Sequence, residues 1–286
     1  MDQASTLRKI KNGAMKGVKV ISVTSGKGGV GKTNVVANLA IALAKMGKKV
    51  LILDADMGLG NLDVLLGIAP MYNMNHVIRG EKTLKEIMVG GPYGIKILPA
   101  SSGVQELTAL TASQRMNLFM EVDKLEHEID VMLIDTAAGI SSDVLFFNIA
   151  AQEIIVVVSP EPTSMTDAYA IMKVLHTKHG ENRFRLLVNS AKGVKESAEV
   201  YRKISLVAER FLNISIDYLG YIPYDENVQK AVREQRAIID IYPDSKASKC
   251  FVELAKRVEE ITTPSELKGN VQFFWQRLTE VMMGAR

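Results

Sequence analysis

Cysteine and tryptophan are almost missing from this chain of 286 residues, which has one of each and only 6% aromatic residues. A single cysteine, Cys250, excludes an intramolecular disulfide and a metal site built from several cysteines of one chain. No apolar run approaches the roughly 20 residues that a transmembrane helix needs. The first residues also lack the apolar segment of a secretory signal. We therefore expect a protein that is made and kept in the cytoplasm.

An excess of charge is also missing, because the formal net charge is only +3. Residues 1–19 hold five basic residues and one acid, and residues 262–286 hold three basic residues and two acids, which leaves a net charge of −2 for the rest. Nucleic-acid-binding domains gather Lys and Arg on the folded body. We therefore expect no direct nucleic-acid partner. With 47% hydrophobic and 23% charged residues, the composition is that of an ordinary globular protein.

A glycine-rich segment, Ser25 to Thr33, lies between an apolar run and a helical pattern, and fits G-x-x-x-x-G-K-[ST]. A glycine-rich turn at a helix N-terminus directs backbone N–H groups at one point, which suits a triphosphate. We expect Lys32 to reach the outer phosphates and Thr33 to ligate Mg²⁺. A chance glycine-rich turn is the alternative, but the flanking strand and helix stand where the motif needs them. The predicted nucleotide-binding residues of the loop are Gly28, Gly29, Val30, Gly31, Lys32, Thr33 and Asn34.

Acids follow two of the apolar runs that are typical of buried parallel strands. Asp54 and Asp56 follow residues 50–53, and Asp135 follows residues 131–134. In open α/β sheets, ligands lie at the carboxyl ends of the strands. We expect Asp54 and Asp135 to hold Mg²⁺ through water, and Asp56 to orient or deprotonate the water that attacks the γ-phosphate. Solvated acidic turns without a metal role are the alternative.

The predicted fold class is α/β, with a mostly parallel twisted sheet that is covered by helices on both faces, the architecture of P-loop NTPases. We predict an ATPase domain over residues 18–261, an arm over 1–17, a linker over 262–270 and an amphipathic helix over 271–286.

A second lysine inside the loop, Lys27, departs from the plain phosphate-loop motif. This deviant loop resembles that of the MinD/ParA family of ATPases, and Asp-Thr-Ala-Ala-Gly at 135–139 matches the second switch of that family. The resemblance implies ATP and Mg²⁺ as cofactors and a homodimer in the ATP state, with Lys27 crossing to the nucleotide of the other subunit. Residues 54–63, which read D-A-D-x-G-L-G-N-L-D, resemble the first switch of MinD and more closely that of FlhG. This resemblance implies that Asp56 is needed for hydrolysis. The family resemblance also places Asn189 and Pro223 around the adenine, although one Asn and one Pro are weak signals alone.

The N-terminal arm carries a more specific resemblance. Residues 2–8 match the D-Q-A-x-x-L-R motif of the FlhG (FleN, YlxH) regulators of flagellar number. The resemblance implies that the arm docks on FlhF, a GTPase of the signal-recognition type, and stimulates its hydrolysis. The residues that carry the match are Asp2, Gln3, Leu7 and Arg8, with Gln3 matching the glutamine that enters the active site of the GTPase. A solvated, disordered arm is the alternative.

The C-terminal segment repeats apolar residues on one helical face after a proline-containing linker. The only Trp stands on that face, where an amphipathic ring suits a membrane interface. MinD and FlhG have membrane-targeting C-terminal helices, so the resemblance implies peripheral membrane association in the ATP state. A C-terminal helix packed on the core is the alternative. The predicted membrane-binding residues are Val271, Phe274, Trp275, Leu278, Val281 and Met282.

Several functions remain possible for such a chain. The prediction is an ATPase switch that regulates flagellar number or placement and contacts a flagellar transcription regulator or switch-complex protein. A division-site regulator of the MinD type is one alternative. A DNA-partition ATPase of the ParA type is a second, which the body charge of −2 disfavours. Iron–sulfur carriers of the same superfamily need at least two cysteines per subunit, so they are excluded.

Overall fold

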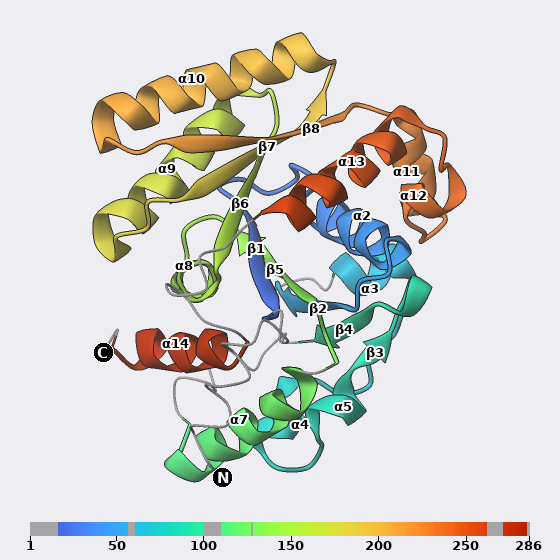
Figure 1. Ribbon diagram of the computed structural model, residues 1–286, viewed down its shortest axis with the longest axis vertical. Coiled ribbons are helices and arrows are strands. Elements are labelled where there is room, and N and C mark those ends of the chain that lie inside the picture. The colour runs from blue at the N-terminus through green and yellow to red at the C-terminus, as the bar shows by residue number, and fades with distance from the viewer. Residues whose placement is uncertain (1–16, 57–60, 100–109, 127, 262–270, 285–286) are drawn as a thin grey trace.

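The computed structural model describes residues 17–56, 61–99, 110–126, 128–261 and 271–284. Within these residues the chain forms an eight-stranded sheet in the order β3-β4-β2-β5-β1-β6-β7-β8 (Figure 1). All neighbouring strands are parallel except β3, which is antiparallel to β4. The strands are β1 (Lys19–Ser25), β2 (Val50–Ala55), β3 (Val89–Gly90), β4 (Lys96–Pro99), β5 (Val131–Ala138), β6 (Glu153–Val158), β7 (Phe184–Ala191) and β8 (Ile216–Pro223). The prediction of a mostly parallel α/β sheet is confirmed.

The strands are apolar because helices cover both faces of the sheet. Every residue of β2 and of β6 is buried. Successive side chains of a strand point to opposite faces, so Ile52 joins the core on one face while Leu51 and Leu53 join the core on the other. A parallel sheet buried on both faces needs such continuous hydrophobic runs.

Helices on the first face pack around the helix that follows the phosphate loop. Helix α2 contacts α13, and α13 also covers β8. These helices stand together in the right half of Figure 1. They are α2 (Lys32–Lys45), α3 (Asn61–Leu66), α11 (Glu226–Arg233), α12 (Ile238–Ile241) and α13 (Lys246–Glu260).

Helices on the second face follow one another along the sheet from β8 towards β4. They are α10 (Val194–Leu212), α9 (Pro162–His179), α8 (Ser142–Ala150), α14 (Val271–Gly284) and α7 (Ala112–Glu126). Two short helices, α4 (Met74–Ile78) and α5 (Leu84–Ile87), and a 3₁₀ turn (Pro92–Gly94) lie near β3 and β4 (Figure 1).

The C-terminal helix α14 is part of this second layer. It packs against α7 and α8 and reaches β1. Its residues Val271, Phe274, Trp275 and Leu278 are each at most 2% exposed. At its edges Gln272 donates a hydrogen bond to Asp123 of α7, and Arg277 lies 3.9 Å from Glu181.

Four of the six predicted membrane-binding residues therefore contact protein in this structure, as in the alternative of a packed C-terminal helix. The side chains of Val281 and Met282 lie outside the described part. A membrane role for this face, which stays a prediction, requires α14 to leave its place between α7 and α8. No helix among the described residues is both long and apolar enough to cross a membrane.

The packing of α14 predicts a large effect of truncating its central side chain. Trp275 is 2% exposed, whereas Phe273 on the opposite face of the helix is 55% exposed. Removing a buried aromatic side chain typically costs about 3–5 kcal/mol, because a cavity is left behind. We expect Trp275→Ala to lower the free energy of unfolding by that amount and Phe273→Ala to change it by less than about 1 kcal/mol. Urea unfolding followed by circular dichroism measures both. Equal losses in the two variants would show that α14 does not pack as described.

Candidate functional site

The phosphate loop is the turn that joins β1 to α2 at the carboxyl edge of the sheet. Gly29 and Gly31 have φ angles of 80° and 84°, which L side chains rarely adopt. These left-handed residues curl the backbone so that its N–H groups converge, which is the geometry of an anion-binding nest. Helix α2 begins at Lys32, so the positive end of its dipole faces the same point.

At two further positions of the loop, glycine is needed for reasons other than a left-handed backbone. A Cβ at Gly26 would lie 2.0 Å from the carbonyl oxygen of Asp167 in α9, so the loop and α9 touch through their backbones. A Cβ at Gly28 would meet no atom within 4 Å. The fold therefore gives no internal reason for glycine at position 28, whereas close approach of a phosphate to the backbone does.

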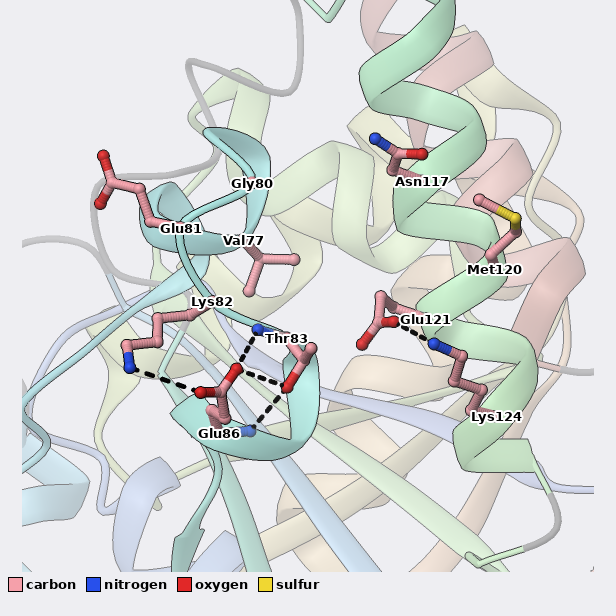
Figure 2. Close-up of a pocket in the computed structure, with 10 residues that line it drawn as sticks. All are labelled: Val77, Gly80, Glu81, Lys82, Thr83, Glu86, Asn117, Met120, Glu121 and Lys124. Carbon is pink, nitrogen blue, oxygen red and sulfur yellow. Dashed lines mark hydrogen bonds and ion pairs between the residues drawn. The ribbon is translucent and has the colours of Figure 1, made fainter.

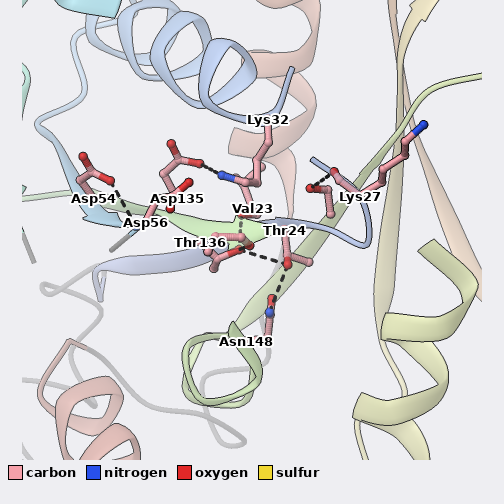
Figure 3. Close-up of polar contacts among 11 residues, drawn as sticks. Val23, Thr24, Lys27, Lys32, Asp54, Asp56, Asp135, Thr136 and Asn148 are labelled. Carbon is pink, nitrogen blue, oxygen red and sulfur yellow. Dashed lines mark hydrogen bonds and ion pairs between the residues drawn. The ribbon is translucent and has the colours of Figure 1, made fainter. Parts of the chain in front are cut away.

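Lys32 and Asp135 form a buried ion pair at the centre of the site (Figure 3). The two side chains are only 7% and 1% exposed. The Thr33 hydroxyl is close enough to Asp135 to oppose the rise in the pKa of that carboxyl. A buried charge needs a partner, so Asp135 compensates the Lys32 ammonium inside the protein. The structure thus brings together the predicted phosphate-binding lysine and both the hydroxyl and one carboxylate of the predicted metal site.

Asp54 lies next to this pair, because β2 and β5 run parallel with Asp54 opposite Asp135. The backbone N–H of Asp56 donates to Asp54 Oδ1 at 3.3 Å. Burial, followed by the negative charge of Asp135, raises the pKa of Asp54 to about 7. Burial also raises the pKa of Asp135, which Lys32 opposes. Two buried carboxylates side by side at a strand edge form a place where a cation is favourable.

The donor chemistry fits Mg²⁺. This ion prefers oxygen ligands and is usually bound by one or two carboxylates together with substrate phosphates and waters. Thr33, Asp54 and Asp135 supply a hydroxyl and two carboxylates, all of them oxygen donors. Their position beside the phosphate loop is where such an ion would also reach the phosphates of a nucleotide.

The residues predicted around the adenine lie at the same edge. Asn189 at the end of β7 is 8% exposed, and its Nδ2 donates to the carbonyl oxygen of Val30 at 2.7 Å. A Cβ at Gly31 would lie 2.4 Å from that Nδ2. Pro223 ends the neighbouring strand β8, paired with Ala191. Asn189 therefore fastens the phosphate loop, and its contact with adenine stays a prediction.

The second lysine of the loop points elsewhere. Lys27 Nζ donates to Glu161 Oε2 at 2.7 Å and to Thr163 Oγ1 at 3.0 Å. In Figure 3 its side chain extends away from Lys32 and Asp135. Glu161 and Thr163 were not predicted from the sequence. Their signal was an acid followed by Pro at the end of an apolar strand, which is where a helix such as α9 begins.

A buried polar cluster below the loop was also missed (Figure 3). Asn148 of α8 accepts a hydrogen bond from Ser22 at 2.8 Å and donates to Thr24 at 3.3 Å. Thr136, which follows Asp135, lies 3.1 Å from Thr24. All four side chains are 0% exposed. The Asn148 bonds fix α8 against β1, and the Thr136 bond joins β1 to β5 beside the acids. Ser and Thr inside an apolar strand were the only signal.

The best-formed cavity among the described residues lies away from this edge and is lined by none of the predicted site residues. A cavity of about 340 Å³ lies between the α4–α5 turn and α7 (Figure 2). Four of its charged side chains are already paired: Glu86 accepts hydrogen bonds from Thr83 and Lys82, and Lys124 pairs with Glu121. The arm residues Asp2, Gln3, Leu7 and Arg8 lie outside the described residues.

A glycine-rich loop between a central parallel strand and a helix, with acids at the ends of two neighbouring strands and a lysine pair in the loop, defines a P-loop ATPase of the MinD/ParA type. Residues 18–186 match a family model described as an AAA domain. The antiactivator FleN of Pseudomonas aeruginosa is 46% identical over 268 residues, which cover 94% of this chain and 96% of FleN. The flagellum site-determining protein YlxH of Helicobacter pylori is 34% identical over 238 residues, which cover 83% of this chain and 80% of YlxH.

Solved structures have the same fold. MinD in the MinC:MinD cell division complex of Aquifex aeolicus is 28% identical, with a TM-score of 0.65, over 86% of this chain and 98% of that chain. The chain belongs to the MinD/ParA family of ATPases, in the branch that contains FleN and YlxH, also called FlhG. It is therefore an ATPase, as predicted.

The raised pKa of Asp54 predicts a pH-dependent stability. An unfolded Asp ionises near 3.8 but the folded one near 7, so the folded chain binds more protons between these values and loses stability as the pH rises through them. Between these pH values the parent loses up to about 4 kcal/mol of its free energy of unfolding. Asp54→Asn cannot ionise, so we expect its free energy of unfolding to exceed that of the parent by more at pH 8 than at pH 5.

Urea unfolding in EDTA without nucleotide measures this effect. Asp244→Asn, at an exposed position, is the matched control and should show no such trend. An Asp54→Asn effect of the same size at pH 5 and pH 8 would contradict the prediction.

Proposed function

We propose that this ATPase is a dimerising switch that uses ATP to cycle on and off the membrane and regulates flagellar number or placement. The observation that carries the proposal is the pair of lysines in one loop. Lys32 lies buried on Asp135, inside the site, whereas Lys27 is 38% exposed and extends out of it. A lysine directed outwards from a phosphate loop can reach a second subunit once it leaves Glu161 and Thr163 of its own chain. The name of the YlxH relative, a flagellum site-determining protein, supports the flagellar output.

Nucleotide binding follows from the loop. A bound triphosphate would supply anionic oxygens to the loop, and Mg²⁺ would supply positive charge that stabilises phosphoryl transfer. Lys32 turns from Asp135 to the phosphates, which releases the Asp135 carboxylate. Thr33, Asp54 and Asp135 would hold the metal, directly or through water. Gly139 N–H, which donates to Ser25 O at 2.9 Å in this structure, is free to contact phosphate once that hydrogen bond opens.

Hydrolysis depends on Asp56 in this proposal. It lies two residues beyond Asp54 at the carboxyl edge, and its side chain is half-buried. From there its carboxylate orients the attacking water or accepts its proton. Lys27 of a second subunit stabilises the charge that develops on the phosphates, in the manner of a cation supplied in trans.

Membrane association depends on α14 in this proposal. The apolar face that packs against α7 and α8 is the face that would enter a bilayer, so the helix binds either the body or lipid. One short helix binds lipid weakly. Two helices in an ATP-bound dimer raise the avidity without any new contact.

The N-terminal arm gives the flagellar output. Its match to the D-Q-A-x-x-L-R motif supports docking on an FlhF-type GTPase, with Gln3 in the active site of that GTPase. A flagellar transcription regulator or switch protein is a further partner, which the word antiactivator in the name of the FleN relative supports.

The membrane cycle predicts ATP-dependent and tail-dependent binding to vesicles. We expect the intact chain to co-sediment with anionic liposomes several times more strongly with Mg-ATP than with Mg-ADP. A chain that ends at Pro264 should stay in the supernatant in both. Because α14 packs on the core, nucleotide binding by the shortened chain is the control for folding. Equal sedimentation in all four conditions would contradict the switch.

The arm predicts a separate activity. Deleting residues 1–12 should abolish stimulation of an FlhF-type GTPase and leave the ATPase rate of this chain unchanged, since no predicted ATPase residue lies in the arm. Gln3→Ala should reduce the stimulation at least tenfold, with Ser5→Ala as the control, because Ser5 falls on an unspecified position of the motif. GTP hydrolysis under single-turnover conditions measures both. Full stimulation by the Gln3→Ala variant would remove the role given to Gln3.

A further inference from the structure

The ammonium of Lys27 is already occupied by groups of its own subunit. Glu161 Oε2 lies 2.7 Å and Thr163 Oγ1 3.0 Å from Lys27 Nζ. A lysine ammonium has three N–H donors, so two of the three are used here. Neither acceptor belongs to the phosphate loop, because both come from the start of α9.

This contact is built into the backbone. The carbonyl of Asp167 and the amide of Ala168 in α9 pack on Gly26 so closely that a Cβ there would overlap them. Pro162 occupies the first turn of α9, and the Ser164 hydroxyl accepts a hydrogen bond from Ser159 N–H at 3.0 Å. The first turn of α9 is thus fixed against the loop, with Glu161 and Thr163 beside Lys27.

The same contact directs Lys27 away from its own nucleotide site. Lys32 and Asp135 lie in the opposite direction from the ammonium of Lys27 (Figure 3). Lys27 therefore contacts neither Asp135 nor Asp54 of its own site. A nucleotide bound to a second copy of the chain is the one that Lys27 could contact.

We propose that Glu161 is a positioning residue that holds Lys27 within its own subunit and opposes the contact of Lys27 with the nucleotide of a second subunit. The proposal rests on the proposed ATP-dependent dimer. When that dimer forms, each Lys27 exchanges the Glu161 carboxylate for phosphate oxygens, so the Lys27–Glu161 ion pair is broken twice in a symmetric dimer. Glu161 thereby raises the protein concentration at which dimers form. The hydrogen bond from Lys27 to Thr163 has a weaker effect in the same direction, because Thr163 is uncharged.

The size of the effect follows from exposure. Lys27 and Glu161 are 38% and 62% exposed, and an exposed ion pair changes an equilibrium only a little. Two such pairs per dimer correspond to about a 2- to 20-fold change in the dissociation constant. The change should shrink as salt rises, because exposed charges are screened.

The experiment compares the full chain with Glu161→Gln by sedimentation velocity across protein concentrations in Mg-ATP, with ATPase rate per subunit measured in parallel. We expect the variant to dimerise at a 2- to 20-fold lower concentration, and its ATPase rate to rise at that lower concentration. Thr163→Val should also lower the concentration at which dimers form, but by less. It replaces Glu161→Gln as the test if that variant folds poorly.

Glu199→Gln is the matched control. Glu199 pairs with Lys203 at 2.7 Å and is 56% exposed, so the substitution makes the same charge change on a similar ion pair of α10. It should leave dimerisation unchanged. In a Lys27→Ala background, adding Glu161→Gln should have no effect, because Glu161 acts through Lys27.

Different outcomes overturn different claims. If the parent chain stays monomeric in Mg-ATP at all concentrations, the proposed dimeric switch fails and the role of Glu161 fails with it. If the parent dimerises but Glu161→Gln does so no more tightly, only the role of Glu161 fails. The same holds if Glu199→Gln gives an equal shift, if the shift persists in the Lys27→Ala background, or if it does not shrink in high salt.

Discussion

The parallel pairing of β2, β5 and β1 is the constraint on which the site depends. It places Asp54 opposite Asp135 and Asp135 opposite Val23, two residues before the phosphate loop begins. Residues that are far apart in the chain therefore meet at one carboxyl edge. The same pairing buries the two carboxylates together, and this burial raises the pKa of Asp54. A cation at this edge would relieve both their repulsion and their desolvation.

The two lysines of the loop show how burial separates roles within one short segment. Lys32 is buried on Asp135, where an unpaired charge would cost several kcal/mol, so it can leave only for another anion. Lys27 is held on the surface by Glu161, where the ion pair is weak and exchange costs little. The buried Lys32 is suited to bind the phosphates of its own subunit. The exposed Lys27 is suited to a contact that forms only when a second subunit binds.

Helix α14 presents a comparable choice between partners. Its apolar face fills a place in the helical layer between α7 and α8, and the face that is buried there is the face that a lipid surface would accept. Because hydrophobic burial is not directional, the same residues can serve either partner. The buried hydrogen bonds of Asn148 with Ser22 and Thr24 tie α8 to the strands beside the nucleotide site. Helix α8 therefore contacts both α14 and a strand of the site.

The sequence by itself determined the parallel sheet, the phosphate loop and the acids that follow the strands. These features depend on local patterns: continuous apolar runs, glycines at fixed spacing and charges at strand ends. It also determined the amphipathic character of α14. Only the tertiary structure decided that this helix packs on the body, that Asn189 fastens Val30, and that Glu161 and Thr163 hold Lys27. The physical reason is that periodicity shows which face of a helix is apolar or which lysine is in a loop. The identity of the partner depends on contacts between segments that are more than a hundred residues apart.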